Sequence, residues 1–158
     1  MKKIKMIILS VLLILLLPII LINSVIIVNS YIKPNEIPSF FGWKPFIVLS
    51  GSMETQINTG DLVVVKDAQN TELKNGDIIA FKNGDSVITH RIVDKVEEEG
   101  KIKYKTKGDN NNATDDWYVS PEQIEGIYQF KMSKLGNIAM FIQTPIGMII
   151  CLSIPIIL

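Results

Sequence analysis

A short serine-containing stretch, Val48-Leu49-Ser50-Gly51-Ser52-Met53-Glu54, holds the first residues whose types and spacing point to chemistry. A serine hydroxyl becomes an effective nucleophile when a nearby base removes its proton and hydrogen-bond donors stabilise the resulting oxyanion. Ser50 offers a second hydroxyl two residues before Ser52, and Gly51 between them lets a substrate backbone approach closely. Because Ser-Gly-Ser is also common turn chemistry, a nucleophile at Ser52 requires a base and an orienting group elsewhere in the chain.

The candidate base is His90, the only histidine in the sequence. It lies in the β-branched run Val87–Val93, and alternation along a strand places it on one face with Ile88 and Ile92. An imidazole that is neutral near pH 7 can accept the serine proton and return it to a leaving amine. The structural alternative is a core histidine whose hydrogen bonds are satisfied among the isoleucines.

The candidate orienting groups are three carboxylates, Asp109, Asp115 and Asp116, in a polar run over residues 107–116. A base of this kind usually needs a carboxylate that holds the imidazole. A solvated loop and a calcium loop are the alternatives, and an EF-hand requires Asp or Asn at its fifth position, Gly at its sixth and Glu at its twelfth. Counted from Asp109, these positions hold Ala113, Thr114 and Ser120. An EF-hand is therefore excluded, whereas a calcium site of another geometry stays open.

The elements that must position these groups are short strands between Ile57 and about Lys131. Val, Ile and aromatic residues between turn signals predict strands over residues 61–66, 77–81, 87–96, 101–107 and 124–130. Asn83-Gly84-Asp85 predicts a hairpin turn, and Ser120-Pro121-Glu122-Gln123 predicts a capped turn. The expected fold is mainly β, a small antiparallel sheet or barrel.

Long apolar runs flank this region. The run from Met6 to Val28 has no charged residue, and about 20 apolar residues suffice for a membrane-spanning helix. A cleavable signal peptide is disfavoured because its apolar core is usually about 7–15 residues. Three lysines within residues 1–5 predict a cytoplasmic N-terminus. The apolar run from Ile138 to Leu158 predicts a second transmembrane helix.

These features predict three parts: an N-terminal cytoplasmic stub and transmembrane anchor over residues 1–30, an extracytoplasmic β catalytic domain over 31–135, and a C-terminal transmembrane helix over 136–158. Residues 31–45 are interpreted as a linker. The aromatic residues around it belong either to the membrane interface or to the core of the domain: Tyr31, Phe40, Phe41, Trp43 and Phe46.

Composition excludes several other classes. The 16 basic and 16 acidic residues cancel, whereas a nucleic-acid-binding face is usually basic. The single cysteine, Cys151, excludes an intrachain disulfide and a zinc site built on cysteines.

Taken in order, five motifs closely resemble those of type I signal peptidases, specifically the endoplasmic-reticulum type that also occurs in archaea and in the SipW-like branch of some Gram-positive bacteria. The motifs are Ser50-Gly51-Ser52-Met53-Glu54, Gly60-Asp61, Gly76-Asp77-Ile78-Ile79, Thr89-His90-Arg91 and Lys107-Gly108-Asp109-Asn110-Asn111. The resemblance covers about residues 40–130 and the flanking apolar runs. It implies a membrane-tethered antiparallel β domain that removes signal peptides from exported preproteins after small residues, with no metal or cofactor.

The resemblance also implies roles for individual residues. Ser52 matches the nucleophile, Ser50 and the Ser52 backbone N–H match the oxyanion hole, and His90 stands where the more familiar bacterial enzymes carry a lysine base. Asp109 matches the aspartate of the Gly-Asp motif. A second aspartate falls on Asp115 or Asp116, and which aspartate binds the imidazole stays open. Thr55 departs from the proline that is common in the family.

Two other interpretations remain to be tested. One is a catalytically silent, membrane-tethered β domain that binds exported proteins. The other is a related Ser-Lys peptidase with Lys82 or Lys95 as the base. In the main interpretation the partners are signal peptides and the lipid bilayer. The protein is then a multi-pass protein of the cell membrane, or of the endoplasmic reticulum in a eukaryote.

Overall fold

The computed structural model describes residues 39–68, 71–98 and 100–157, together with single positions between residues 6 and 37. It divides into two compact units, Met1–Gly42 and Trp43–Leu158, and the second holds the β-sheet and the candidate site residues. The predicted N-terminal membrane span over residues 6–28 falls largely outside the described residues.

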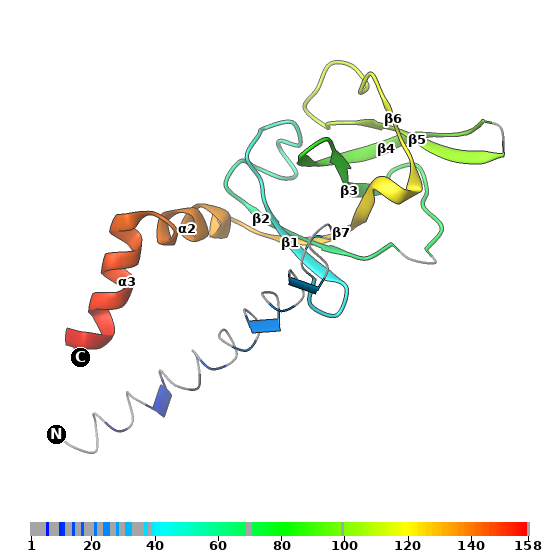
Figure 1. The fold of residues 1–158 in the computed structure, drawn as a ribbon. Coiled ribbons are helices and arrows are strands. Elements are labelled where there is room, and N and C mark those ends of the chain that lie inside the picture. The colour runs from blue at the N-terminus through cyan, green and yellow to red at the C-terminus, as the bar shows by residue number, and fades with distance from the viewer. Residues whose placement is uncertain are drawn as a thin grey trace. The chain divides into compact units, whose positions relative to one another are not determined.

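The second unit is built on one antiparallel sheet (Figure 1). Its seven strands are β1 (Trp43–Ile47), β2 (Leu62–Lys66), β3 (Ile78–Asn83), β4 (Ser86–Glu98), β5 (Lys101–Lys107), β6 (Tyr118–Val119) and β7 (Ile124–Met132). They lie side by side in the order β1-β2-β7-β3-β4-β5-β6. A short 3-10 helix, η1 (Pro121–Gln123), precedes β7. The prediction of a mainly β, antiparallel fold is confirmed.

Five of the seven strands lie where the sequence predicts them, and the Asn83-Gly84-Asp85 turn is confirmed by the pairing of Asn83 with Ser86. The capped turn is also confirmed, because Ser120 and Gln123 form a capping box at η1. The interpretation of residues 31–45 as a linker is wrong for its last part, since Trp43–Ile47 forms β1. Pro45 lacks a backbone donor and argues against a central strand, but β1 is the outermost strand, where a proline is tolerated.

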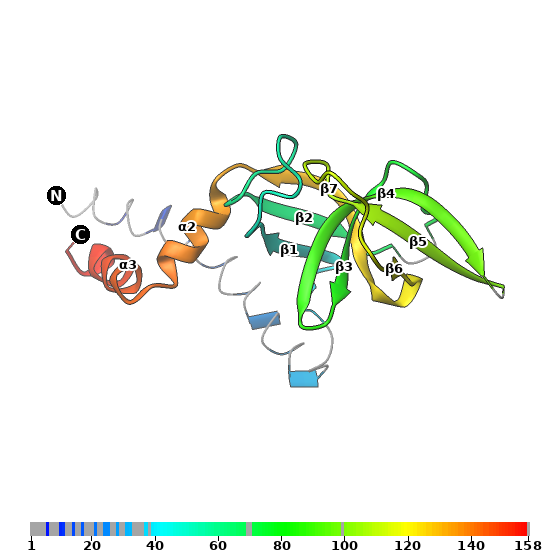
Figure 2. The same cartoon turned by 90° about the horizontal axis from the view of Figure 1, so that it is seen from above.

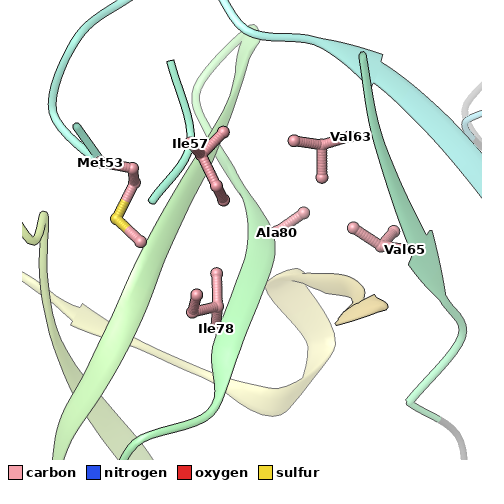
Figure 3. Close-up of a cluster of buried hydrophobic side chains, with 6 residues drawn as sticks. All are labelled: Met53, Ile57, Val63, Val65, Ile78 and Ala80. Atoms are coloured by element: carbon pink, nitrogen blue, oxygen red, sulfur yellow. The ribbon is translucent and has the colours of Figure 1, made fainter. Parts of the chain in front are cut away.

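The core consists of two clusters on opposite faces of β3. Because strand side chains alternate, Ile78 and Ala80 enter the first cluster, whereas Ile79 and Phe81 enter the second. The first cluster brings together six buried side chains: Met53, Ile57, Val63, Val65, Ile78 and Ala80. Figure 3 shows them converging around β3, with Met53 and Ile57 supplied by the segment before β2. This segment carries Ser52.

The aromatic residues near the start of the chain do not behave as one group. Phe46 packs against the first core cluster, and Trp43 contacts Phe130 of β7 with 6.2 Å between ring centroids. Tyr31 and Phe41 are exposed to 85% and 81%. The core interpretation therefore applies to Phe46.

The sheet is followed by two short helices, α2 (Leu135–Ile142) and α3 (Pro145–Ile157), which continue from the end of β7 (Figure 2). The sequence predicts one helix over the apolar run from Ile138 to Leu158, and this is corrected by the break at Gln143 and Thr144. Proline at 145 favours this break because it cannot donate the hydrogen bond that would continue α2. Within the described part of the chain, no helix combines the length and apolar character needed to cross a membrane.

The start of α2 is fixed to the sheet by Asp61. The Asp61 carboxylate is 98% buried and accepts hydrogen bonds from the backbone N–H groups of Asn58 at 3.0 Å and Lys134 at 3.1 Å. It also pairs with Lys131 Nζ at 2.9 Å. Gly136 allows the close approach, because a Cβ atom there would lie 2.7 Å from the Asp61 carbonyl oxygen.

Candidate active site

Ser52 lies in the loop between β1 and β2, and the loop is anchored on both sides of it. Met53, the next residue, is 98% buried in the first core cluster, and Ile57 is fully buried there. At the base of the loop, the backbone N–H of Val48 donates to the Asp61 carbonyl and that of Gly60 donates to the Val48 carbonyl. Burying Met53 therefore fixes the backbone that carries the Ser52 hydroxyl.

The Ser52 hydroxyl, the His90 imidazole and the Asp115 carboxylate form a continuous chain of hydrogen bonds. His90 Nε2 lies 3.1 Å from Ser52 Oγ, and His90 Nδ1 lies 2.7 Å from Asp115 Oδ2. His90 and Asp115 are 95% and 93% buried. These are the distances and the order expected of a nucleophile, a general base and an orienting carboxylate.

Asp115 is held by its neighbour across the loop, Thr106 of β5. The fully buried Thr106 hydroxyl donates to Asp115 Oδ2 at 2.6 Å, and the Asp115 backbone N–H donates to the Thr106 carbonyl at 2.9 Å. The carboxylate is thus fixed by two contacts that do not involve His90. Asp115 can therefore set the orientation of the imidazole rather than follow it.

His90 lies at a change in the pairing of β4. It pairs with Ile79 of β3, and its ring meets Phe81 edge-on with 6.4 Å between centroids. From Arg91 onward β4 also pairs with β5, whereas Ser86–His90 pairs only with β3 among the described residues. The imidazole consequently lies next to an open strand edge, where its Nε2 can reach Ser52.

The beginning of the same loop, Gly108-Asp109-Asn110, holds the backbone of Ser52 rather than the imidazole. The Asn110 backbone N–H donates to the Ser52 carbonyl at 2.8 Å, and Asn110 Nδ2 donates to the Gly51 carbonyl at 3.1 Å. A Cβ atom on Gly108 would lie 2.6 Å from the Ser52 carbonyl oxygen. Glycine is therefore required at 108 for this contact.

Asp109 binds Arg91, not His90. Arg91 donates two hydrogen bonds to it, from Nε at 2.8 Å and from an Nη at 2.6 Å. Further donations reach the Gly76 carbonyl and Gln56 Oε1, both at 2.7 Å. The hydrogen bonds to Asp109 raise the pKa of the Arg91 guanidinium above its ordinary value, so the guanidinium stays charged. Arg91 thus ties the Asp109 loop to the segment that follows Ser52.

The structure therefore separates the three aspartates that the sequence groups together. Asp115 contacts the imidazole, Asp109 contacts Arg91, and Asp116 is exposed. Within the described residues, no group of three or more His, Cys, Asp or Glu side chains is arranged to hold a metal ion. Arg91 and Asn110 belong to motifs visible in the sequence, but what they contact is visible only in the three-dimensional structure.

The other predicted residues are also placed. Ser50 Oγ lies 3.4 Å from Ser52 Oγ, so the two hydroxyls face one another. Lys82 Nζ lies 3.2 Å from Glu125 Oε1, and Lys95 Nζ lies 4.0 Å from Glu72 Oε1. Neither lysine lines the pocket around Ser52, so the geometry does not favour a lysine base.

A groove of about 650 Å³ opens beside Ser52 and His90. One wall comes from the end of β1 and the segment after it, residues 46–50, and the other from the open edge of β4, residues 86–89. Three strands, β2, β7 and β3, lie between β1 and β4 in the sheet. Since β1 and β4 nevertheless line the same groove, the sheet must curl. The groove thus has the strand edges and apolar lining that suit an extended peptide.

Comparison with known proteins agrees with this geometry. A family model described as Peptidase S24-like matches residues 46–128, which include Ser52, His90 and Asp115. Signal peptidase I W of Bacillus subtilis (strain 168) is 38% identical over 93 residues, 58% of this chain and 49% of that protein.

Eukaryotic proteins match as well. The signal peptidase complex catalytic subunit SEC11 of Metarhizium acridum is 43% identical over 72 residues, 44% of this chain and 42% of that protein. SEC11C of Homo sapiens is 40% identical over 73 residues, 44% of this chain and 38% of that protein. The chain thus spans about half or less of the length of these relatives. Because the family model covers more than half of its residues, the chain belongs to the Peptidase S24-like family.

Proposed function

We propose that this protein is a serine endopeptidase that removes signal peptides from exported preproteins, cleaving after small residues. The observation that carries the proposal is the chain of hydrogen bonds from Ser52 through His90 to Asp115. The similarity to proteins named signal peptidase I W and signal peptidase complex catalytic subunit supports this choice of substrate.

In the proposed reaction, His90 Nδ1–H donates a hydrogen bond to Asp115 Oδ2, and Nε2 accepts the proton of the Ser52 hydroxyl. Ser52 Oγ then bonds to the scissile carbonyl carbon. The imidazolium returns its proton to the leaving amine as the C–N bond breaks, leaving an acyl ester on Ser52. A water molecule gives a proton to the same Nε2 and attacks the ester carbonyl carbon. The imidazolium returns that proton to Ser52 Oγ as the ester C–O bond breaks, and the carboxylate product leaves.

The oxyanion that forms in both steps needs hydrogen-bond donors. We assign this role to the Ser52 backbone N–H and the Ser50 hydroxyl. The 3.4 Å separation of the two serine Oγ atoms supports this assignment, because a hydroxyl so close to the nucleophile can turn toward the new oxygen.

The substrate would bind as an extended strand in the groove. The open edge of β4 over Ser86–Thr89 offers backbone groups for strand pairing, and Phe46 and Val48 on the opposite wall offer apolar contacts.

We also propose that the protein is a multi-pass membrane protein divided into an anchor over residues 1–30, an extracytoplasmic catalytic domain over 31–135 and a C-terminal membrane segment over 136–158. Large apolar side chains on α2 and α3 support attachment to lipid, since Ile138 and Phe141 are about half exposed and Ile146 and Ile149 are each 67% exposed. Such side chains gain free energy when lipid covers them. Attachment would bring the site to substrates that emerge from the bilayer and raise their effective concentration.

The proposal is tested by replacing Ser52 with alanine and measuring the processing of a preprotein reporter. Cleavage is expected to fall at least about 10³-fold, because the acyl ester cannot form. Thr71→Ala, which removes an exposed hydroxyl away from the groove, serves as the control and should cleave normally. Undiminished cleavage by Ser52→Ala would rule out Ser52 as the nucleophile, whereas a wild type that binds the reporter without cleaving it would favour a silent binding domain.

A further inference from the structure

The groove beside Ser52 carries charge of one sign only. Lysine and arginine are absent from its described lining, and its two carboxylates are Asp85 and Asp115. Asp115 is buried and bound to His90 and Thr106. Asp85, in the turn between β3 and β4, is exposed and makes no hydrogen bond or ion pair with any described residue. Its charge is therefore available to a molecule that occupies the groove.

The distance between Asp85 and His90 can be estimated from the part of β4 that joins them. Asp85 precedes His90 by five residues, and β4 begins at Ser86. At about 3.4 Å per residue, a strand covers about 17 Å over this interval. An extended substrate paired along the open edge of β4 rises by nearly the same distance per residue as β4. It would therefore bring a side chain about five residues from the scissile bond to Asp85.

We infer that Asp85 determines specificity by favouring preproteins that carry a lysine or arginine four to six residues from the cleaved bond. This inference rests on the proposed peptidase function and names a substrate class within it. Two features carry it: a carboxylate that lines the groove without a partner among the described residues, and a described lining that holds no lysine or arginine to neutralise it or repel a basic side chain. An acidic side chain at the same place in the substrate would be disfavoured by like-charge repulsion.

The test is a charge scan on the full-length protein reconstituted in phospholipid vesicles. Preprotein reporters carry lysine or glutamate at each position from three to seven residues on either side of the cleavage site. The measured quantity at each position is kcat/KM for the lysine reporter divided by kcat/KM for the glutamate reporter. Because Asp85 is exposed and the pair is screened, the wild-type ratio is expected to be about 2 to 5 within one window and near unity elsewhere.

Variants assign the effect to Asp85. Asp85→Asn should bring the ratio in that window to unity, and Asp85→Lys should invert it. Asp94→Asn, which removes an exposed carboxylate of β4 away from the groove, should keep the wild-type ratio. Thermal unfolding of each variant checks that the fold is retained.

The outcomes separate this inference from the function on which it rests. If the wild type cleaves the reporters but Asp85→Asn shows the same ratios at every position, the inference is wrong and the peptidase function stands. If the wild type cleaves no reporter, both are wrong.

Discussion

The two ends of the loop over residues 108–116 illustrate how one polar segment performs two different tasks. At its end, Asp115 is buried and contacts the imidazole. At its beginning, Gly108, Asp109 and Asn110 contact Arg91 and the backbone around Ser52. Both ends carry an aspartate, but the burial and the partner of the two carboxylates differ. We therefore expect substitutions at Asp115 to act on the proton transfer, and substitutions at 108–110 to act on the position of the nucleophile.

The largest expected effect is that of Asp115→Asn. An amide can hold the ring in place, but it favours the wrong imidazole tautomer and cannot stabilise the imidazolium. We expect kcat to fall about 10³- to 10⁴-fold in the reporter assay with KM little changed. Asp116→Asn is the matched control, because Asp116 is the exposed neighbour. Equal losses in the two variants would contradict the assignment of Asp115.

A smaller loss is expected when Gly108 becomes alanine. The new Cβ would lie 2.6 Å from the Ser52 carbonyl oxygen, so the nucleophile backbone or the loop must move. A displacement of about 1 Å can cost roughly 10²-fold in rate, and we expect kcat to fall by about that factor.

Gly100→Ala provides a control for backbone strain alone. Gly100 has a φ of 72°, so alanine is strained there, but its Cβ would meet no atom within 4 Å. This variant should lose stability of about 1–2 kcal/mol in chemical unfolding yet keep its kcat. If Gly100→Ala lost as much activity as Gly108→Ala, general destabilisation would explain both.

Arg91→Lys should have a modest effect. Lysine cannot form the paired hydrogen bonds to Asp109 while also reaching Gly76 and Gln56, so the segment after Ser52 loosens. Because Arg91 and Asp109 are partly exposed, the stability cost should be only about 1 kcal/mol. We expect kcat to fall about 3- to 10-fold, with faster amide hydrogen exchange over residues 51–57. Faster exchange at Thr106 and Asp115 instead would contradict the division of the loop.

Asp61 is a useful contrast to Asp109 and Asp115, because its substitution should lower the stability of the fold without lowering kcat. Burial opposes ionisation of Asp61, but hydrogen bonds from Asn58, Lys131 and Lys134 outweigh it and lower its pKa below the ordinary value of 3.8. Such a carboxylate stabilises the fold fully above the pKa of the unfolded chain, and the stabilisation is lost as pH falls through the lowered pKa of the folded state.

Asp61→Asn should therefore lower Tm at neutral pH, with a difference from the wild type that shrinks below about pH 4. Its kcat at neutral pH should stay within about twofold of the wild type, because Asp61 contacts no residue of the Ser52–His90–Asp115 chain. A Tm difference that is constant with pH would show that the charge of Asp61 contributes nothing.

Much of this molecule can be predicted from local sequence. Alternating β-branched residues and turn signals depend on neighbouring positions, so β2, β3, β4, β5 and β7 and the turns at 83–85 and 120–123 were predictable. The ordered motifs predicted that Ser52, His90 and an aspartate belong to one site, and His90 lies within hydrogen-bond distance of both Ser52 and Asp115. β1 was not predictable in the same way, because its strand character comes from pairing with β2 and its proline argues against a strand.

Only the tertiary structure decided which aspartate reaches the imidazole, because three carboxylates within eight residues are equivalent by type. The pairing of β5 with β4 places Thr106 opposite Ile92, two residues after His90, and Thr106 then fixes Asp115 at Oδ2. The same pairing places Lys107 beside Arg91, so that the next residues, Gly108 and Asp109, fall against Ser52 and the guanidinium. Sequence determines which groups are available, whereas the register between β4 and β5 determines which of them meet, because no local pattern predicts which residues of two strands pair.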